Sequence, residues 1–465
     1  MAPNGEDIEG ISFGTDGWRA RGEEFSVPRI RAVGQATVDY LDDEGRDGPL
    51  AIGYDARENS EMAAKELARV LAAGGRDVTV AARDCPTPAL AWTVGDGPFV
   101  AGLMVTASHN PPEYNGIKFV GADGAPALPD VTEGLAERLR APEPGSEAVY
   151  GTVEREQLHE PYLDHAQSYA DGDLDGFAVA VDAMHGSARG ATDELLDRMG
   201  ATVTRLRCDR DPSFGGGSPE PGPENAEQLL SDVADGNADL GFINDGDGDR
   251  IGVVTPDHGY LDPNLVLALL YQFVLESEGG DAARTVSTSS LVDKIAEEAG
   301  FSTHETPVGF KWIAQAMGDH DIVAGGEESG GYGVAGHLHN KDGVLIAALL
   351  AAAHVERALD DRIEEIRSTH GFRVQSRRSV SCPDERKPAV LAGIDGEFDD
   401  EIAGAAVESV NDIDGVKFLL SDDSWLLIRP SGTEPKMRVY AESETGERTA
   451  ALLDAGEAAV EAVLD

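Results

Sequence analysis

Residues 239–250 read DLGFINDGDGDR, an apolar run that gives way to a loop of alternating aspartate and glycine. The run at 239–243 is short and bounded by polar residues, which is typical of a buried strand in an α/β protein. Asp245, Asp247 and Asp249 place three carboxylates within five residues, and like charges so close repel one another unless a cation neutralises them. Because all the ligands are oxygens, the loop favours Mg²⁺ or a similar hard ion.

This loop does not fit an EF-hand, since Arg250 and Pro256 occupy the positions that need glycine and glutamate. An acidic surface turn is the simpler alternative in so acidic a chain. The place of the loop directly after a buried strand, with Arg250 next to it, favours the metal site.

Three other polar, glycine-containing segments also follow apolar, strand-like runs. They are TASHNPPEYNG at 106–116, GGEESGG at 325–331 and RPSGTEP at 429–435. In open α/β sheets, ligands bind beyond the carboxyl ends of the strands. The four segments therefore predict four domains that face a shared cleft.

Strand-like and helix-like segments alternate along most of the chain, including strands expected at 50–54 and 285–288, which favours an α/β fold. Residues 141–147 (APEPGSE) are a candidate linker. The C-terminal part differs, with closely spaced strands before a closing helix, and predicts a small antiparallel α+β domain. We place the four domains at 1–147, 148–257, 258–370 and 371–465.

The chain of 465 residues carries 86 acidic and 37 basic residues, a formal charge of −49, with only 8 lysines. A surface this acidic and poor in lysine is typical of adaptation to very high salt, where screening removes the self-repulsion. Nucleic acids and anionic membranes are disfavoured as partners, because both bind basic surfaces. The apolar content of 41% is nevertheless enough for packed cores.

Three cysteines are too few for a disulfide framework or a cysteine zinc site. The N-terminal residues lack a signal-peptide pattern, and the longest apolar run, 344–353, is far shorter than the roughly 20 residues of a membrane-spanning helix. We therefore expect a cytoplasmic protein.

Ser108 lies in a segment that Pro111, Pro112 and Gly116 make stiff and sharply turned. A lone serine is more often a turn or cap residue than a nucleophile. A serine held toward a divalent ion, however, suits phosphoryl transfer, in which positioning and charge neutralisation supply most of the catalysis.

The other two segments offer groups for a phosphorylated sugar. In 429–433, one arginine, two hydroxyls and a glycine can surround a phosphate, although an ordinary Pro/Gly turn is the alternative. Glu327 and Ser329 suit sugar hydroxyls. Half of the lysines lie in or near the four segments: Lys118, Lys311, Lys341 and Lys436.

Together and in this order, the four motifs resemble those of the α-D-phosphohexomutase superfamily, the phosphoglucomutases and phosphomannomutases, over essentially the whole chain. FGTDGWR at 13–19 also resembles the N-terminal signature of the family. The resemblance implies three similar α/β domains and a fourth domain like the TATA-binding-protein fold, arranged around a central cleft.

For the site, the resemblance implies that Ser108 is phosphorylated and joins Asp245, Asp247 and Asp249 around one Mg²⁺ per chain. Arg19 is expected near the reacting phosphate. Lys118 and His109 are alternative general acid/base residues. The residues expected to bind substrate are Arg250, Gly309, Lys311, Glu327, Ser329, Arg429, Ser431, Gly432, Thr433 and Arg438.

The implied reaction moves phosphate reversibly between O1 and O6 of a hexose, through a bound hexose 1,6-bisphosphate. Several relatives have histidine where this chain has Gly331, and GEESGG together with TPVGFK at 306–311 is more similar to glucose-type mutases. Mannose and glucosamine stay open as substrates. A metal phosphatase with Asp245 as nucleophile and a non-catalytic sugar-phosphate-binding protein are the rivals, and we expect a monomer or weak dimer.

Overall fold

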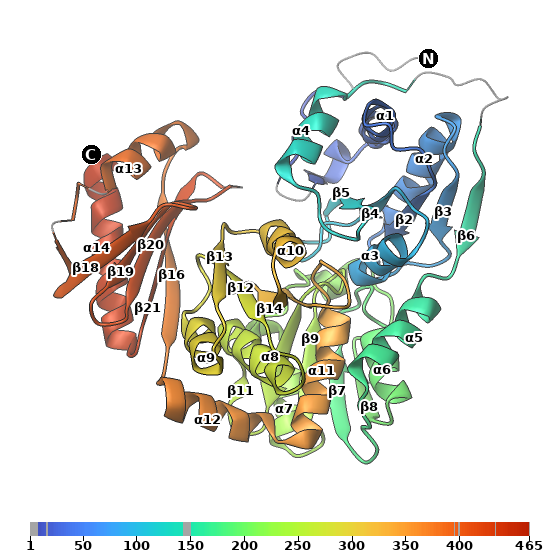
Figure 1. Ribbon diagram of the computed structural model, residues 1–465. Helices are drawn as coiled ribbons and strands as arrows, with labels where there is room; N and C mark the ends of the chain where they lie inside the picture. The colour runs from blue at the N-terminus through green and yellow to red at the C-terminus, as the bar shows by residue number, and fades with distance from the viewer. Residues whose placement is uncertain are drawn as a thin grey trace.

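Four sheets follow one another along the chain in the computed structural model, which describes residues 8–14, 17–142, 150–394, 396–398, 400–432 and 434–464. Figure 1 shows them in sequence from blue to red. The first three sheets are mixed and the fourth is antiparallel, which confirms the predicted fold class. The exact domain bounds stay a prediction, and residues 143–147 of the predicted linker lie outside the described part.

The first sheet has the strand order β1-β5-β4-β2-β3-β6. Its central strands β2 and β4 are parallel to each other and fully buried, as expected of apolar strands with helices on both faces. The strands are β1 (Gly17–Arg21), β2 (Leu50–Tyr54), β3 (Val78–Ala81), β4 (Ala101–Val105), β5 (Tyr114–Gly121) and β6 (Val153–Glu156), and the helices are α1 (Val27–Asp43), α2 (Ser60–Ala73), α3 (Thr87–Asp96) and α4 (Pro129–Glu137).

In the second sheet the strand order is β11-β10-β9-β7-β8, with β9 buried along its whole length. This strand is the apolar run that precedes the aspartate loop. The strands are β7 (Ala178–Asp182), β8 (Thr202–Leu206), β9 (Leu240–Asn244), β10 (Ile251–Thr255) and β11 (Gly259–Tyr260), and the helices are α5 (His159–Ala170), α6 (Thr192–Arg198) and α7 (Glu227–Ala234).

The third sheet has the order β13-β12-β14-β15. Its most apolar helix, α11, is buried over residues 343–353 and packs against helices of both the second and third domains. The strands are β12 (Asp281–Thr285), β13 (Thr303–Thr306), β14 (Ile322–Gly326) and β15 (Tyr332–Val334), and the helices are α8 (Pro263–Ser277), α9 (Leu291–Ala299), α10 (Phe310–Asp319), α11 (Gly343–Glu356) and α12 (Leu359–His370).

The prediction of a strand at 285–288 is wrong for residues 286–288, because β12 begins at Asp281 and ends at Thr285. The strand includes Arg284, a residue that a buried strand normally excludes. Here its charge is neutralised by Asp293 at 2.5 Å and by Glu305, so that the arginine is buried without an unpaired charge.

The fourth sheet is antiparallel, in the order β16-β21-β20-β19-β18-β17. One face packs on α13 and α14 and forms a separate apolar core, while Trp425, Leu427 and Tyr440 on the other face contact Val286 of the third domain. In Figure 1 this sheet stands beside β13, and α12 leads into it. The elements are β16 (Val374–Ser381), α13 (Lys387–Ile394), β17 (Glu401–Ile402), β18 (Ala405–Asn411), β19 (Val416–Leu420), β20 (Trp425–Pro430), β21 (Lys436–Ser443) and α14 (Gly446–Leu464).

Each polar segment identified in the sequence begins at or near the end of a strand: β4, β9, β14 and β20. The fold thus brings together, at strand ends, loops that lie far apart in the sequence. In the described part of the chain, none of the helices has the combination of length and apolar character needed to cross a bilayer.

Candidate active site

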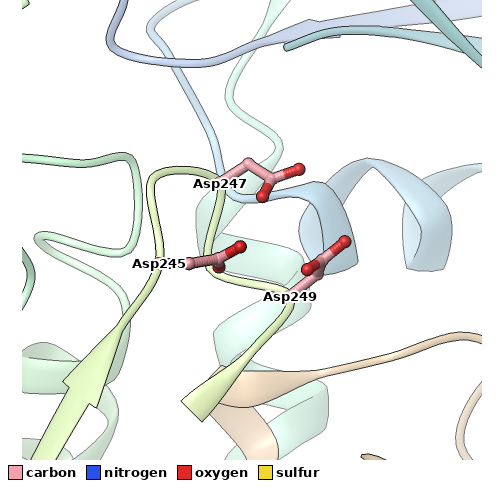
Figure 2. Close-up of side chains that lie close together, drawn as sticks. All are labelled: Asp245, Asp247 and Asp249. Carbon is pink, nitrogen blue, oxygen red and sulfur yellow. The ribbon is translucent and has the colours of Figure 1, made fainter. Parts of the chain in front are cut away.

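The three aspartates of the loop after β9 form a compact anionic group. Asp245, Asp247 and Asp249 are at most 1% exposed, and each offers a carboxylate oxygen within 4.8 Å of the other two. Figure 2 shows the three side chains extending from one loop. The Oδ1 atoms of Asp247 and Asp249 are buried without a hydrogen-bond donor. Buried, unpaired anionic oxygens fit a hard divalent cation, so these residues can hold a metal.

Positive side chains surround this group. Lys118 Nζ lies 2.8 Å from Asp247 Oδ2 and 3.0 Å from Asp249 Oδ2, and Lys341 Nζ lies 3.5 Å from Asp249 Oδ2. With the half-buried Arg250 adjoining, three positive side chains balance three carboxylates. One divalent cation and one phosphate dianion, added together, leave this balance unchanged.

The environment separates the pKa values of the aspartates. Burial and the charges of Asp247 and Asp249 raise the pKa of Asp245. Burial also opposes ionisation of Asp247, but the charge of Lys118 and its hydrogen bond outweigh it, so the pKa of Asp247 lies below its usual value. Thr87 Oγ1, at the start of α3, donates to Asp247 Oδ2 at 2.7 Å and so ties the loop to the first domain.

Ser108 faces this group across a domain boundary. Its Oγ donates to Asp245 Oδ2 at 2.8 Å, and the residue is 2% exposed with a left-handed φ of 52°. Its N–H donates to Thr106 Oγ1 at 2.8 Å. The left-handed conformation is uncommon for a residue with a side chain, and here it directs the hydroxyl toward the aspartates.

Arg57 explains how this backbone conformation is held. Its side chain is 1% exposed, and its terminal nitrogens donate to the carbonyl oxygens of Ser108, Asn110, Pro111 and Tyr114 at 2.6 to 3.0 Å. Asp55 fixes the other edge of the guanidinium, with Arg57 Nε donating to Asp55 Oδ2 at 2.9 Å. One buried arginine thus fixes the backbone path of residues 108–114, the loop that carries Ser108.

A Gly/Pro-rich loop of the second domain, residues 209–223, packs against the serine-containing loop at 106–116. The Phe214 ring centroid lies 4.9 Å from the Arg57 guanidinium, a cation–π contact, and Ser218 Oγ donates to the carbonyl of His109. His109 Nδ1 is 3.4 Å from Ser108 Oγ. The charge of Arg250, burial and the charge of Arg19 lower the pKa of His109 to about 2, so its ring is neutral at physiological pH.

A cavity of about 800 Å³ lies beside these groups and is lined by residues of all four domains. The sequence-predicted site residues that line it are Arg19, His109, Arg250, Gly309, Glu327, Ser329, Arg429 and Arg438. Register explains part of this convergence, since Arg19 of β1 pairs with Gly116 of β5 and Gly17 pairs with Lys118.

Other predicted residues lie elsewhere. Lys311 is on the buried side of α10 and lines a different cavity of about 590 Å³ between α10 and the loop after β5. Gly432 is exposed, and Thr433 lies outside the described residues. Ser431 is 3% exposed, and its Oγ is buried without a hydrogen-bond partner.

At the C-terminal domain, each predicted arginine has a carboxylate neighbour. Arg429 NH2 lies 2.9 Å from Asp414 Oδ2, and Arg438 NH2 lies 3.1 Å from Glu434 Oε2. Arg429 and Arg438 are directly opposed on β20 and β21, so that their side chains leave the same face of the sheet.

Sequence reasoning missed four residues of this region: Arg57, Thr87, Lys341 as a neighbour of the aspartates, and Arg377, which lines the central cavity. For Arg57 a local signal existed, because DAR directly follows the predicted strand at 50–54. Thr87 carries no such signal, since its contact joins residues 160 positions apart.

Comparison with known proteins gives the family. Residues 10–145, 160–259, 262–369 and 379–459 match domains I, II, III and the C-terminal domain of phosphoglucomutase/phosphomannomutase. The chain is 34% identical to a Methanopyrus kandleri protein named "Probable phosphoglucosamine mutase", over 96% of each chain. It is 30% identical to a Thermococcus kodakarensis "Phosphoglucomutase/phosphomannomutase", over 96% of this chain and 98% of that protein.

A solved structure supports the same fold. A phosphoglucomutase/phosphomannomutase family protein of Burkholderia thailandensis superposes with a TM-score of 0.86 at 23% identity, covering 99% of this chain and 98% of that one. The chain belongs to the phosphoglucomutase/phosphomannomutase family of the α-D-phosphohexomutase superfamily, and it is a mutase, an enzyme of the isomerase class.

Proposed function

We propose that the protein interconverts hexose 1-phosphate and hexose 6-phosphate through a phosphorylated Ser108. The observation that carries the proposal is the 2.8 Å contact between Ser108 Oγ and Asp245, next to a cavity that is also lined by arginines of the fourth domain. A phosphate on Ser108 adjoins a cation-binding group and faces a second anion site, as transfer between two ends of one sugar requires.

In the proposed reaction a sugar hydroxyl attacks the phosphorus of phospho-Ser108. The sugar O–P bond forms, the Oγ–P bond breaks, and the hydroxyl proton passes through Lys118 or His109 to Ser108 Oγ. The resulting bisphosphate presents its other phosphate to Ser108. The reverse exchange then regenerates phosphoserine and releases the isomeric hexose phosphate.

Asp245, Asp247, Asp249 and a phosphoserine oxygen would hold one Mg²⁺. When bound, the ion neutralises charge on the transferring phosphoryl group. Arg57 and Thr106 keep the serine in its orientation, and Lys118 keeps Asp247 and Asp249 ionised.

Glucose is the hexose we propose as preferred. A Cβ at Gly331 would come within 2.3 Å of Lys341 Cδ, so the lysine stem occupies the space that a histidine would need. The loop GGEESGG at 325–331 therefore differs physically from that of relatives with histidine at the position of Gly331. Glucosamine is the second candidate, since Glu220 and Glu327 line the cavity and can face an amino group.

The test compares glucose, mannose and glucosamine 1-phosphates as substrates, with wild type and Ser108→Ala in parallel. We expect glucose 1-phosphate to give the highest kcat/KM and mass spectrometry to locate phosphate on Ser108. Release of inorganic phosphate, with a hydroxylamine-labile phosphate on Asp245, would establish the phosphatase rival instead.

A further inference from the structure

Two rows of side chains on the fourth sheet face away from its helices. Register pairs Arg438 of β21 with Ser379 of β16 on one side and with Arg429 of β20 on the other, and directly opposed residues share one face. The next row along the strands contains Arg377 and Tyr440. Tyr440 belongs to an apolar cluster with Val286 of the third domain and, like Arg377, lines the central cavity, so this face is the one turned toward that cavity.

Arg377 therefore stands beside the two arginines expected to bind phosphate. Arg377 and Arg438 are diagonal neighbours on adjacent strands, a position at which Cα atoms are about 7–8 Å apart and long side chains can reach each other. Both line the central cavity, as does Arg429.

The next residue along the strand, Arg378, has the opposite orientation. It pairs across the strand with Val439 of the apolar core, and its NH1 lies 2.6 Å from Asp454 and 2.7 Å from Glu457 of α14. The alternation of β16 thus turns one of two consecutive arginines to the helix layer and the other to the cavity.

Without Arg377, the positive charge at this end of the cavity is too small to neutralise a phosphate. Arg429 and Arg438 are each paired with a carboxylate, which offsets much of their charge. By contrast, no carboxylate among the described residues lies within 4.0 Å of Arg377. A phosphate monoester carries close to two negative charges at neutral pH, more than the two paired arginines neutralise.

We propose that Arg377 is a further phosphate-positioning residue, which binds the phosphate that is not being transferred. The inference rests on the proposed function, because it assigns Arg377 to the end of the cavity opposite Ser108. An unpaired guanidinium supplies two donors in a fixed fork that matches phosphate oxygens. It also holds the bisphosphate while its reacting end exchanges.

The experiment compares Arg377→Ala, Arg377→Lys and Arg378→Ala with wild type in molar KCl. We expect Arg377→Ala to lower kcat/KM for glucose 6-phosphate about 10- to 100-fold, mainly through KM, because a charge-assisted contact is lost. Arg377→Lys should recover part of this loss, since charge remains without the fork. Arg378→Ala removes the same charge from the opposite face and should stay within about twofold.

A second readout needs no catalysis: the rise in melting temperature on adding glucose 6-phosphate or inorganic phosphate. We expect a smaller rise for Arg377→Ala than for wild type, with equal melting temperatures in the absence of ligand. Values of kcat/KM and ligand-induced rises equal to wild type would overturn the role of Arg377. If wild type does not isomerise any hexose phosphate, the proposed function fails. The rise in melting temperature with inorganic phosphate then tests Arg377 alone. An equal rise in wild type and Arg377→Ala, or no rise in wild type, overturns the inference.

Discussion

The guanidinium of Arg57 donates to the carbonyl oxygen of Ser108 at 2.6 Å, although the two residues are 51 positions apart. The same side chain bonds three further carbonyls of the loop and one carboxylate, all inside the protein. The orientation of the serine hydroxyl thus depends on a residue that does not contact it.

Arg57→Lys tests this dependence. An ammonium group has three donors and cannot bond four carbonyls and Asp55 together, so we expect a loss of about 2–4 kcal/mol in unfolding free energy. We also expect kcat to fall at least about tenfold, because a misdirected hydroxyl loses its reacting geometry. Urea unfolding and steady-state kinetics measure both. The control is Arg210→Ala, because within the described part of the chain the Arg210 side chain makes a single hydrogen bond, to the Arg57 carbonyl at 3.3 Å.

Ser108→Ala should lower mutase turnover by about a thousandfold or more, since the acceptor oxygen for phosphate is gone. The fold should persist, and the urea midpoint should match that of wild type. The exposed Ser231→Ala serves as the matched control. Near-normal turnover, or phosphate located on another residue of the active enzyme, would disprove the assignment.

Asp247→Asn removes one of three clustered negative charges while Thr87 and Lys118 keep a polar partner. We expect Mg²⁺ affinity to fall about tenfold or more, in parallel with activity. Calorimetric titration of Mg²⁺ measures this directly, with the exposed Asp235→Asn as control. An affinity equal to that of wild type would mean that the aspartates are a structural turn.

Lys417 provides a pH-dependent test of the boundary between the third and fourth sheets. Its Nζ lies 2.5 Å from Glu305 Oε2, yet burial and the positive charge of Arg284 lower the pKa of Lys417 to about 8. The unfolded chain keeps this proton up to about pH 10.4. Between about pH 8 and 10 the folded state therefore binds fewer protons, and stability rises with pH.

We expect wild type to gain about 1–3 kcal/mol relative to Lys417→Met between pH 8 and pH 10. Urea unfolding across this range measures the difference. Lys65→Met is the control, because Lys65 is exposed on α2 and its loss should leave the rise intact. Parallel curves for wild type and Lys417→Met would contradict the lowered pKa.

The sequence predicts some strands of the fold closely and misses others. Strands such as β2 and β9 were predicted closely, because each is an apolar run that ends in polar residues. The position of β12 was missed, since its buried Arg284 depends on carboxylates of two other elements. A local pattern cannot report such a distant partner.

The residues of the candidate site likewise fall into those that the sequence predicts and those that it misses. The aspartates, Ser108 and the arginines of the last domain lie in short motifs, whose chemistry is visible within a few residues. The contacts of Arg57, Thr87 and Arg377 come from packing and strand register, which a motif does not encode. Conversely, Lys311 lies in a motif, but its helix faces another cavity.

Salt is expected to stabilise the protein, because it screens the repulsion between the acidic side chains of the surface. Arg198 lies 2.6 Å from Glu160, 3.2 Å from Asp164 and 2.7 Å from Glu194, so one positive charge draws three carboxylates together and leaves a local excess of two negative charges. With a formal charge of −49, such repulsion extends over the whole surface and also opposes the approach of an anionic substrate. Molar KCl shortens the Debye length to about 3 Å and leaves mainly the contacts within the cavity.

We therefore expect both the melting temperature and kcat/KM to rise from dilute buffer to molar KCl, the reverse of the usual loss of phosphate binding with salt. Glu160→Gln lowers the local excess of negative charge around Arg198 from two to one, so its salt dependence should be shallower than that of wild type. Gln167→Glu, on the same helix, adds a charge and should steepen it. Full stability and peak activity in dilute buffer would contradict this role of the acidic surface and leave the mutase assignment untouched, because screening acts on exposed charges far more than on the buried groups around Ser108.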